Sequence, residues 1–318
     1  MIALVTGASG FLGRHILYSL ALHRPEATIV GADLEPGEAM LDNVRVERLD
    51  VTDPEACRAL LRRAKPSHLV HAAGVTLAAE SDRAMALSMT INVDGTANIL
   101  DAALATGSLT RGIVLSSGGV YRQNPADQAC DEDHTLDLSS PYARSKGAAE
   151  LLLASHPAAD RPDLVVARVG PAYGSFERPR ATRPRVSLIH TLRGALASGR
   201  VLTIGGTDYW RDWTHADDIA AALEGLLVTK TLRHRLYNVS SGTAVSARTI
   251  INHFIGHGLA AVWLEDPDQT DLWLDDAESR TPLDCTRLRA DTGFAPRFGL
   301  ADGLNDVIAA PLSGTPPR

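Results

Sequence analysis

Ile2-Ala-Leu-Val-Thr-Gly-Ala-Ser-Gly-Phe-Leu-Gly13 is the stretch that decides the fold. It opens with an apolar run long enough for one buried strand, and a helix is expected to begin near Phe11. Gly7 permits a tight turn, Gly10 lets a phosphate approach the backbone, and Gly13 lets the helix pack closely on the strand. Free N–H groups at such a helix start attract the pyrophosphate of a dinucleotide. The predicted contacts are Gly7, Ser9, Gly10, Phe11, Leu12 and Gly13.

An acidic residue stands at the end of the second expected strand, Ala27–Asp33. A carboxylate at this point accepts hydrogen bonds from the adenosine ribose hydroxyls and repels a 2′-phosphate. No Arg or Lys is its neighbour in the sequence, so Asp33 favours NAD over NADP. The alternative is a solvated aspartate in the turn before Glu35-Pro-Gly37.

The composition limits the class of protein. The 318 residues, 45% of them hydrophobic, suffice for one large domain or two lobes. A formal net charge of −7 disfavours nucleic acid or an anionic membrane as the main partner. Scattered Cys57, Cys130 and Cys285 indicate a reducing compartment, and neither a disulfide framework nor a zinc site. With no membrane-spanning apolar run and no room for a signal peptide before the first strand, we expect a cytoplasmic protein.

Strands and helices alternate along most of the chain, which predicts a parallel sheet built from βαβ units. Further strands are expected at residues 44–50, 67–74, 111–117, 164–168 and 236–239. The stretch 122–139 is polar and acidic, and we expect a surface loop there. One long helix is expected over residues 82–105, although it contains Asn92 and a glycine that cost helix stability. Such exceptions often have a packing or functional cause.

Tyr142-x-x-x-Lys146 follows a predicted helix start at Ser140-Pro141. Four residues apart on a helix, the two side chains share one face. A phenol of pKa about 10 is a poor base at neutral pH, and a nearby ammonium group brings its pKa down. Tyr142 could then remove a proton from a hydroxyl as hydride leaves the carbon, with Ser117 hydrogen-bonded to the same oxygen.

Further motifs follow in order, and with those above they resemble the extended short-chain dehydrogenase/reductase family, of the NAD-dependent epimerase/dehydratase type. They are Asp50-Val51, H-A-A-G at 71–74, N-V-D-G-T-A-N at 92–98, S-S-G-G-V-Y at 116–121, R-V-G-P-A-Y-G at 168–174, R-D-W-T-H-A-D-D at 211–218 and Y-N-V-S-S-G at 237–242. The resemblance covers nearly the whole chain. It implies a Rossmann-type doubly wound α/β fold with a smaller C-terminal lobe. We expect a cofactor lobe at residues 1–172 and 211–244, a substrate lobe at 173–210 and 245–312, and a flexible tail at 313–318.

The resemblance also implies roles for matching positions. Ser117, Tyr142 and Lys146 would be catalytic, and Lys146 would hold the nicotinamide ribose. Asp50 and Val51 would flank the adenine. The remaining expected cofactor contacts are Asp33, Ala72, Ala73, Gly74 and Asn92, and the expected substrate contacts are Ser117, Gly118, Tyr142 and Arg211. In the family, helices corresponding to Asp82–Ala105 and Tyr142–His156 form a homodimer interface.

Departures from the family pattern limit the choice of substrate. Dehydratases of this family carry Asp-Glu after the catalytic hydroxyl, where this chain has Gly118-Gly119, so a 4,6-dehydratase is disfavoured. Pro171 replaces an asparagine of many nucleotide-sugar members. The arginine-rich residues 178–185 could supply phosphate contacts instead, or form a solvated basic loop. Arg211 would bind a substrate phosphate, or alternatively pair with Asp217 or Asp218, and His71 and His215 are expected to be structural.

Three functions remain open from the sequence. The leading hypothesis is epimerisation of a nucleotide sugar through a transient keto intermediate, with NAD tightly held. The second is a net NAD-dependent dehydrogenase or reductase of a smaller polyol, sugar acid or hydroxy ketone. The third is an NAD-binding regulator without turnover, against which the intact Ser117, Tyr142 and Lys146 count.

Overall fold

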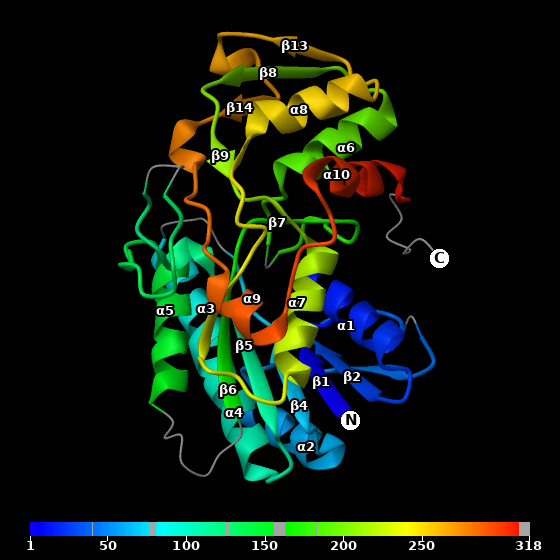
Figure 1. Cartoon of the computed structure of the whole chain (residues 1–318), viewed down its shortest axis with the longest axis vertical. Coiled ribbons are helices and arrows are strands. Elements are labelled where there is room, and N and C mark those ends of the chain that lie inside the picture. Colours follow the sequence, from blue (N-terminus) through cyan, green and yellow to red (C-terminus); the bar gives the residue numbers. More distant parts are fainter. Residues whose placement is uncertain (40, 77–80, 125–127, 156–162, 182, 312–318) are drawn as a thin grey trace.

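The computed structural model describes residues 1–39, 41–76, 81–124, 128–155, 163–181 and 183–311. A larger lobe built on a sheet lies at the bottom of Figure 1, and a smaller lobe lies at the top. The predicted flexible tail, 313–318, lies outside the described residues. No helix in the described ranges combines the length and apolar character needed to cross a bilayer.

The larger lobe contains one sheet of seven parallel strands in the order β11-β6-β5-β4-β1-β2-β3. The chain runs from β1 outward to β2 and β3 and then returns to β4 on the other side of β1. This reversal creates a crevice at the carboxyl ends of β1 and β4, where doubly wound sheets bind ligands. The strands are β1 (Ile2–Thr6), β2 (Thr28–Asp33), β3 (Val44–Arg48), β4 (His68–His71), β5 (Arg111–Ser117), β6 (Asp163–Val169) and β11 (Leu236–Val239).

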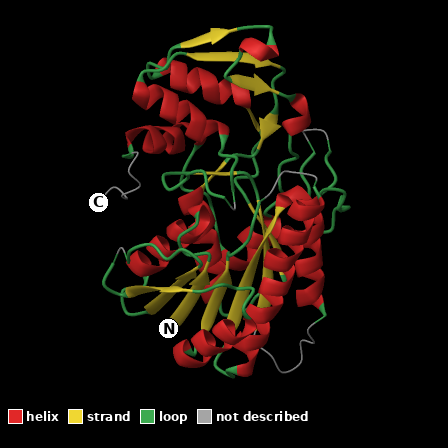
Figure 2. Ribbon diagram, turned by 180° about the vertical axis from the view of Figure 1, so that it is seen from behind, coloured by secondary structure: helices red, strands yellow, loops and turns green. Residues whose placement is uncertain are grey.

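Helices cover both faces of this sheet (Figure 2). One face carries α1 (Phe11–His23), α7 (Ala216–Val228) and α9 (Thr286–Thr292). The other carries α2 (Pro54–Ala64), α4 (Gly95–Ala105) and α5 (Pro141–Ala154), with α3 (Asp82–Met89) packed on α5.

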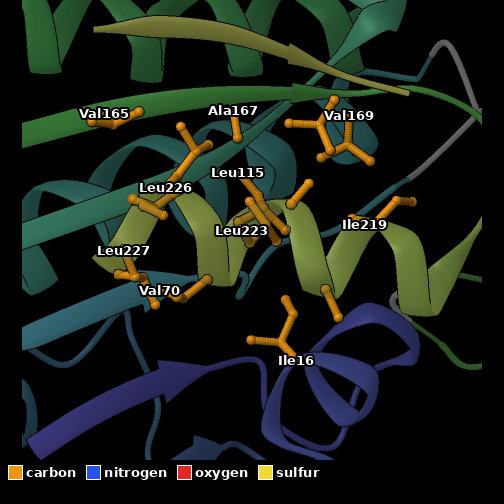
Figure 3. Packing of buried hydrophobic residues seen from close by; sticks show 14 of the residues in the cluster. Ile16, Val70, Leu115, Val165, Ala167, Val169, Ile219, Leu223, Leu226 and Leu227 are labelled. Atoms are coloured by element: carbon orange, nitrogen blue, oxygen red, sulfur yellow. The ribbon is translucent and has the colours of Figure 1, made fainter. Parts of the chain in front are cut away.

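Two hydrophobic cores result from alternation along the strands. Ala3 and Val5 face the α1 and α7 side, while Leu4 between them faces α2 and α4. Figure 3 shows the first core, where α7 places Leu223 and its neighbours against the strands and Ile16 of α1 lies alongside. Burying one such side chain fully contributes about 1.5–3 kcal/mol.

The predicted helix over residues 82–105 is interrupted. The structure has α3, then a π-helical turn at Thr90–Asp94, then α4. Such turns are frequent at functional sites, and this one contains Asn92. The starts of α2 and α5 agree with the sequence prediction. Asp53 accepts hydrogen bonds from two N–H groups of α2, and Ser140 accepts one from Ala143 of α5.

The stretch 122–139, expected as a surface loop, is partly built into the core. Cys130 and Glu132 are buried, and Glu132 Oε1 accepts the Asn238 N–H of β11 at 2.9 Å. The surface-loop expectation is therefore wrong for these two residues, because the end of β11 offers backbone groups that a segment folding back can satisfy.

The smaller lobe packs α6 (Leu188–Ser198), α8 (Ala247–Gly256) and α10 (Leu300–Ala309) against a short parallel sheet, β13 (Ala261–Trp263)-β8 (Leu202–Gly206)-β14 (Leu272–Leu274). Two-residue strands lie where the chain crosses between the lobes: β7 (Ala172–Tyr173) pairs with β10 (Thr214–His215), and β9 (Trp210–Arg211) with β12 (Val245–Ser246). The expected substrate lobe includes residues 245–312, but Leu283, Cys285 and Leu288 pack in the core of the large sheet.

Candidate active site

A cavity of about 830 Å³ lies at the carboxyl ends of the central strands. It is lined by most of the residues that the sequence singles out, together with side chains from the smaller lobe. The predicted residues that line it are Gly7, Gly10, Phe11, Leu12, Gly13, Asp33, Asp50, Val51, Ala72, Ala73, Gly74, Ser117, Gly118, Tyr142, Lys146 and Arg211. Two predicted cofactor contacts, Ser9 and Asn92, are not among the lining residues.

The glycine loop has the geometry that a dinucleotide pyrophosphate requires. Gly7 has a φ of +68°, and a Cβ there would lie 2.7 Å from the backbone of Ala72. A Cβ on Gly13 would lie 2.0 Å from Gly7 O, so Gly13 allows close packing on the loop itself. Gly10 caps α1 without a side chain. The N–H groups of the first turn are thus left for an anion.

Asp33 is held at the end of β2 by backbone donors. Its Oδ2 accepts the Ser9 N–H at 2.9 Å, and its Oδ1 accepts the Glu35 N–H at 3.0 Å. Ser9 Oγ in turn accepts the Gly37 N–H at 2.8 Å, so Ser9 supports the β2 loop behind the cavity. Asp33 has no cationic neighbour along the chain, yet Arg180 Nη1 lies 4.0 Å from Asp33 Oδ1.

Asn92 holds the loop after β4 from behind. Its amide accepts the Val75 N–H at 2.8 Å and donates to Val75 O at 3.1 Å. It also donates to Ser145 Oγ at 2.9 Å, and Ser145 Oγ donates to Tyr142 O at 2.9 Å. The amide is thereby occupied by the protein, so we reassign Asn92 from a cofactor contact to a positioning residue.

Ser117, Tyr142 and Lys146 meet where β5 ends beside the first turns of α5. The Tyr142 hydroxyl lies near the hydroxyls of Ser117 and Thr76, which favour its ionised form. Lys146 Nζ donates to Leu115 O at 3.0 Å. Thr76 was not singled out from the sequence, because no motif distinguishes its hydroxyl from those of other loop residues.

Burial dominates the electrostatics of this group. It raises the pKa of Tyr142, against the opposing effect of the Ser117 and Thr76 hydroxyls and of the Arg183 charge. Burial also lowers the pKa of Lys146 to about 8, although Glu150 opposes this. We expected Lys146 to lower the pKa of Tyr142, and this lowering is not seen in the protein without bound ligands.

Arginines from separate segments line the other end of the cavity. Arg211 Nε donates to Glu278 O, and its Nη2 donates to Glu278 Oε2, both at 2.9 Å. The alternative pairing of Arg211 with Asp217 or Asp218 is wrong. Arg280 also lines this end and was missed, because it comes from a distant loop without a recognisable motif.

Asp212, next to Arg211, lines the cavity with a completely buried carboxyl group. Its Oδ2 accepts hydrogen bonds from Ser240 Oγ and from the Leu283 N–H. Its Oδ1 has no hydrogen-bond partner among the described residues. Burial raises the pKa of Asp212 to about 7.

The histidines expected to be structural lie outside the lining of the cavity. His71 is hydrogen-bonded to Thr6 at 2.7 Å and to Thr96 at 3.0 Å. Burial, with the charge of Lys146, lowers its pKa to about 3, so its ring stays neutral. His215 lies 3.3 Å from Asp306 of α10 and links the lobes.

Comparison with known proteins gives this site its context. The sequence matches the profile of the NAD dependent epimerase/dehydratase family over residues 3–240. The chain belongs to this family. The expected family, fold class and NAD-dependent enzyme are thereby confirmed.

Individual relatives carry out different reactions. The chain is 29% identical to a dTDP-glucose 4,6-dehydratase of Streptomyces griseus, over 96% of this chain and 92% of the relative. It is 28% identical to a UDP-glucose 4-epimerase of Mycolicibacterium smegmatis, over 97% of each chain. The structure of MoeE5 in complex with UDP-glucose and NAD is 26% identical, with a TM-score of 0.78 over 97% of each chain. Similarity alone does not choose between the reactions.

Proposed function

We propose that this enzyme epimerises a nucleotide sugar through a transient keto intermediate. The observation that carries the proposal is a single cavity, which is lined by Tyr142 and Lys146 and also by Arg211 and Arg280. Such an arrangement binds a diphosphate with the arginines while the sugar reaches Tyr142.

The protein groups move and hold the proton. Bound NAD supplies the hydride acceptor for the carbon that is oxidised. Tyr142 takes the proton of the sugar hydroxyl as the C–H bond breaks, and Ser117 donates a hydrogen bond to the same oxygen. After the keto sugar rotates, hydride returns to its other face and Tyr142 gives the proton back.

The raised pKa of Tyr142 means that this step requires positive charge nearby. Lys146 lies one helical turn away on α5, and the Arg183 charge acts on Tyr142 in the required direction. We expect both cations to favour the phenolate once the cavity is filled and water is excluded.

A dehydratase is disfavoured by the residues after Ser117, despite the Streptomyces griseus relative. Gly118 and Gly119 line the cavity where an Asp-Glu pair would be needed to expel water. The second candidate, a net dehydrogenase, is favoured by Pro171, which also lines the cavity and offers no amide to a nucleotide sugar. In that case Arg211 and Arg280 would bind the carboxylate of a sugar acid.

We also propose a cytoplasmic homodimer, with the sheet lobe binding NAD and the smaller lobe binding the sugar nucleotide. Leu151 of α5 supports the dimer, because it is 70% exposed on one of the expected interface helices. The last expected interface residue, His156, lies outside the described residues. Sedimentation as a monomer at micromolar concentration would contradict this proposal.

Deuterium transfer tests the reaction. UDP-glucose deuterated at C4 would be incubated with NAD-loaded enzyme, and then other nucleotide sugars would be tested in the same way. An epimerase gives product that keeps its deuterium at the inverted carbon. No deuterium then passes to free NAD that is added to the solution. A net dehydrogenase instead accumulates deuterated NADH in solution.

A further inference from the structure

The described residues of the loop after β7, 176–181 and 183–187, include arginines that line the cavity together with the glycine loop, and we name them the arginine loop. Phe176 anchors its start on α1, where its ring lies 4.7 Å from the His15 ring and 4.3 Å from the guanidinium carbon of Arg14. Glu177 anchors its end, because its Oε1 accepts the Ser187 N–H at 2.8 Å at the start of α6. The arginine loop is thus fixed to both lobes.

Within the arginine loop, Arg180 and Arg183 pair as a tight hairpin. Each N–H donates to the carbonyl of the other at 3.0 Å. Arg180 Nη1 reaches to 4.0 Å from Asp33 Oδ1, and the Arg183 guanidinium carbon lies 5.1 Å from the centre of the Phe11 ring. Both side chains therefore face the cavity opposite the glycine loop.

Positive charge in this region is only partly balanced. Arg183 Nη2 lies 2.7 Å from Glu177 Oε1, but its Nη1 is buried and has no partner in the described part of the chain. Arg178 lines the same cavity. Three arginines of the arginine loop, Arg178, Arg180 and Arg183, thus lie near two carboxylates, Asp33 and Glu177.

We propose that Arg180 and Arg183 are cofactor-binding residues, which hold the NAD diphosphate against the glycine loop from the side of the smaller lobe. A diphosphate is negatively charged, and a planar guanidinium binds phosphate oxygens in pairs. The unpartnered Nη1 of Arg183 supplies a donor that is already buried. Leaving such a donor without a partner is unfavourable, and a phosphate oxygen would provide the missing acceptor.

The same chemistry could come from the diphosphate of a nucleotide sugar. Position favours the cofactor, because Arg180 lies beside Asp33 at the adenosine end and Arg183 beside Phe11 at the start of α1. Arg185, at the far end of the arginine loop, instead pairs with Glu278 at 2.6 Å beside Arg211. The loop thus spans both ends of the cavity, and holds NAD in place while the sugar is oxidised and reduced.

NAD binding measured without any sugar tests this inference. The inference rests on the proposed function only in taking this cavity as the NAD site. A negative result for NAD binding can therefore be distinguished from a failure of the enzyme to epimerise. We expect Arg183→Ala and Arg180→Ala each to weaken NAD at least about tenfold through faster dissociation, the equivalent of about 1.4 kcal/mol. The matched control, Arg185→Ala from the same loop, should leave NAD affinity unchanged.

Two further measurements separate a lost phosphate contact from a damaged fold. Adenosine, which lacks phosphate, should bind wild type and Arg183→Ala equally, and Arg183→Lys should recover part of the NAD affinity. Thermal unfolding without ligand checks that each variant is folded, and Arg183→Gln replaces Arg183→Ala if that variant is not. Unchanged NAD dissociation in folded variants at both positions would overturn the proposal. So would weaker UDP-glucose binding with unchanged NAD affinity, since the diphosphate would then be the substrate's.

Discussion

The two ends of the cavity are built differently. The end that we propose for the cofactor, here called the cofactor end, uses backbone and short side chains, as in the turn from Gly7 to Gly13 and the Asp33 carboxylate held by two N–H groups. The end that we propose for the substrate, here called the substrate end, uses long arginine side chains from segments far apart in the sequence, such as Arg211 and Arg280. A backbone cradle fixes one ligand, whereas arginines on loops can accept different anionic ligands.

The largest effect is expected where the two ends meet. Tyr142→Phe should lower turnover at least about 100-fold while NAD affinity stays near wild type, because only the proton carrier is removed. Ser117→Ala should also lower turnover, and the losses should not add in the double variant. Steady-state rates of the three variants test this, and additive losses would show that the two hydroxyls act independently.

Lys146→Ala should affect both catalysis and cofactor binding. We expect about 100-fold lower turnover and about tenfold weaker NAD binding, since the charge beside Tyr142 and a ribose contact are both lost. Calorimetric NAD titration beside the kinetic assay measures the two effects. If NAD affinity is retained, Lys146 serves the chemistry alone.

Arg211→Ala should affect the substrate end alone. Hydrogen bonds to charged groups contribute about 1.5–3 kcal/mol, so KM for the nucleotide sugar should rise about 10–100-fold with NAD affinity unchanged. Arg200→Ala, which removes an exposed arginine paired with Asp271 at 3.0 Å in the smaller lobe, is the control. A raised KM in both variants would point to a general effect of charge.

Asp33→Asn should affect the cofactor end alone. Wild type should bind NAD at least about tenfold more tightly than NADP, a difference of about 1.4 kcal/mol. In the variant the ratio of NAD affinity to NADP affinity should be smaller, because Arg180 would face a 2′-phosphate without the negative charge of the Asp33 carboxylate. Calorimetric titration with both nucleotides measures the ratio, and equal affinities in wild type would remove the role of Asp33.

Asp212→Asn should change the stability of the protein at the substrate end, next to Arg211. The pKa of Asp212 is raised to about 7 in the fold, against about 3.9 unfolded. Between these values the folded protein binds more protons than the unfolded chain, so the free energy of unfolding of wild type falls as pH rises from about 4 to 7. Above pH 7 the variant should be more stable than wild type, by an amount on the order of a few kcal/mol.

Urea unfolding of both proteins at pH 4.5 and pH 7.5 measures this difference. The advantage of the variant should be smaller at the lower pH, because the unfolded carboxyl is then only just above its own pKa and its ionisation stabilises the unfolded chain little. An equal difference at both values would show that Asp212 ionises in the fold as it does in the unfolded chain.

The sequence predicted the cofactor end because its chemistry lies in local motifs. Gly7 directly follows β1, Gly10 directly precedes α1 and Asp33 ends β2, so their places are fixed once these elements are recognised. Asn92 was misassigned, because a motif does not tell whether an amide faces a cavity or supports a loop from behind.

The substrate end was harder to predict, because it depends on packing between distant segments. Nothing near Arg180 in the sequence indicates Asp33 as its neighbour, and Glu278 was not recognised as the partner of Arg211. These contacts arise only when the smaller lobe docks on the sheet.

Single-turnover hydride transfer tests the central claim most directly. NAD-loaded wild type and Tyr142→Phe would each be mixed rapidly with a nucleotide sugar that wild type converts, and NADH followed by its absorbance. The account predicts NADH formation in wild type, and formation at least about 100-fold slower in Tyr142→Phe at equal NAD occupancy. Equal rates in the two proteins would contradict it.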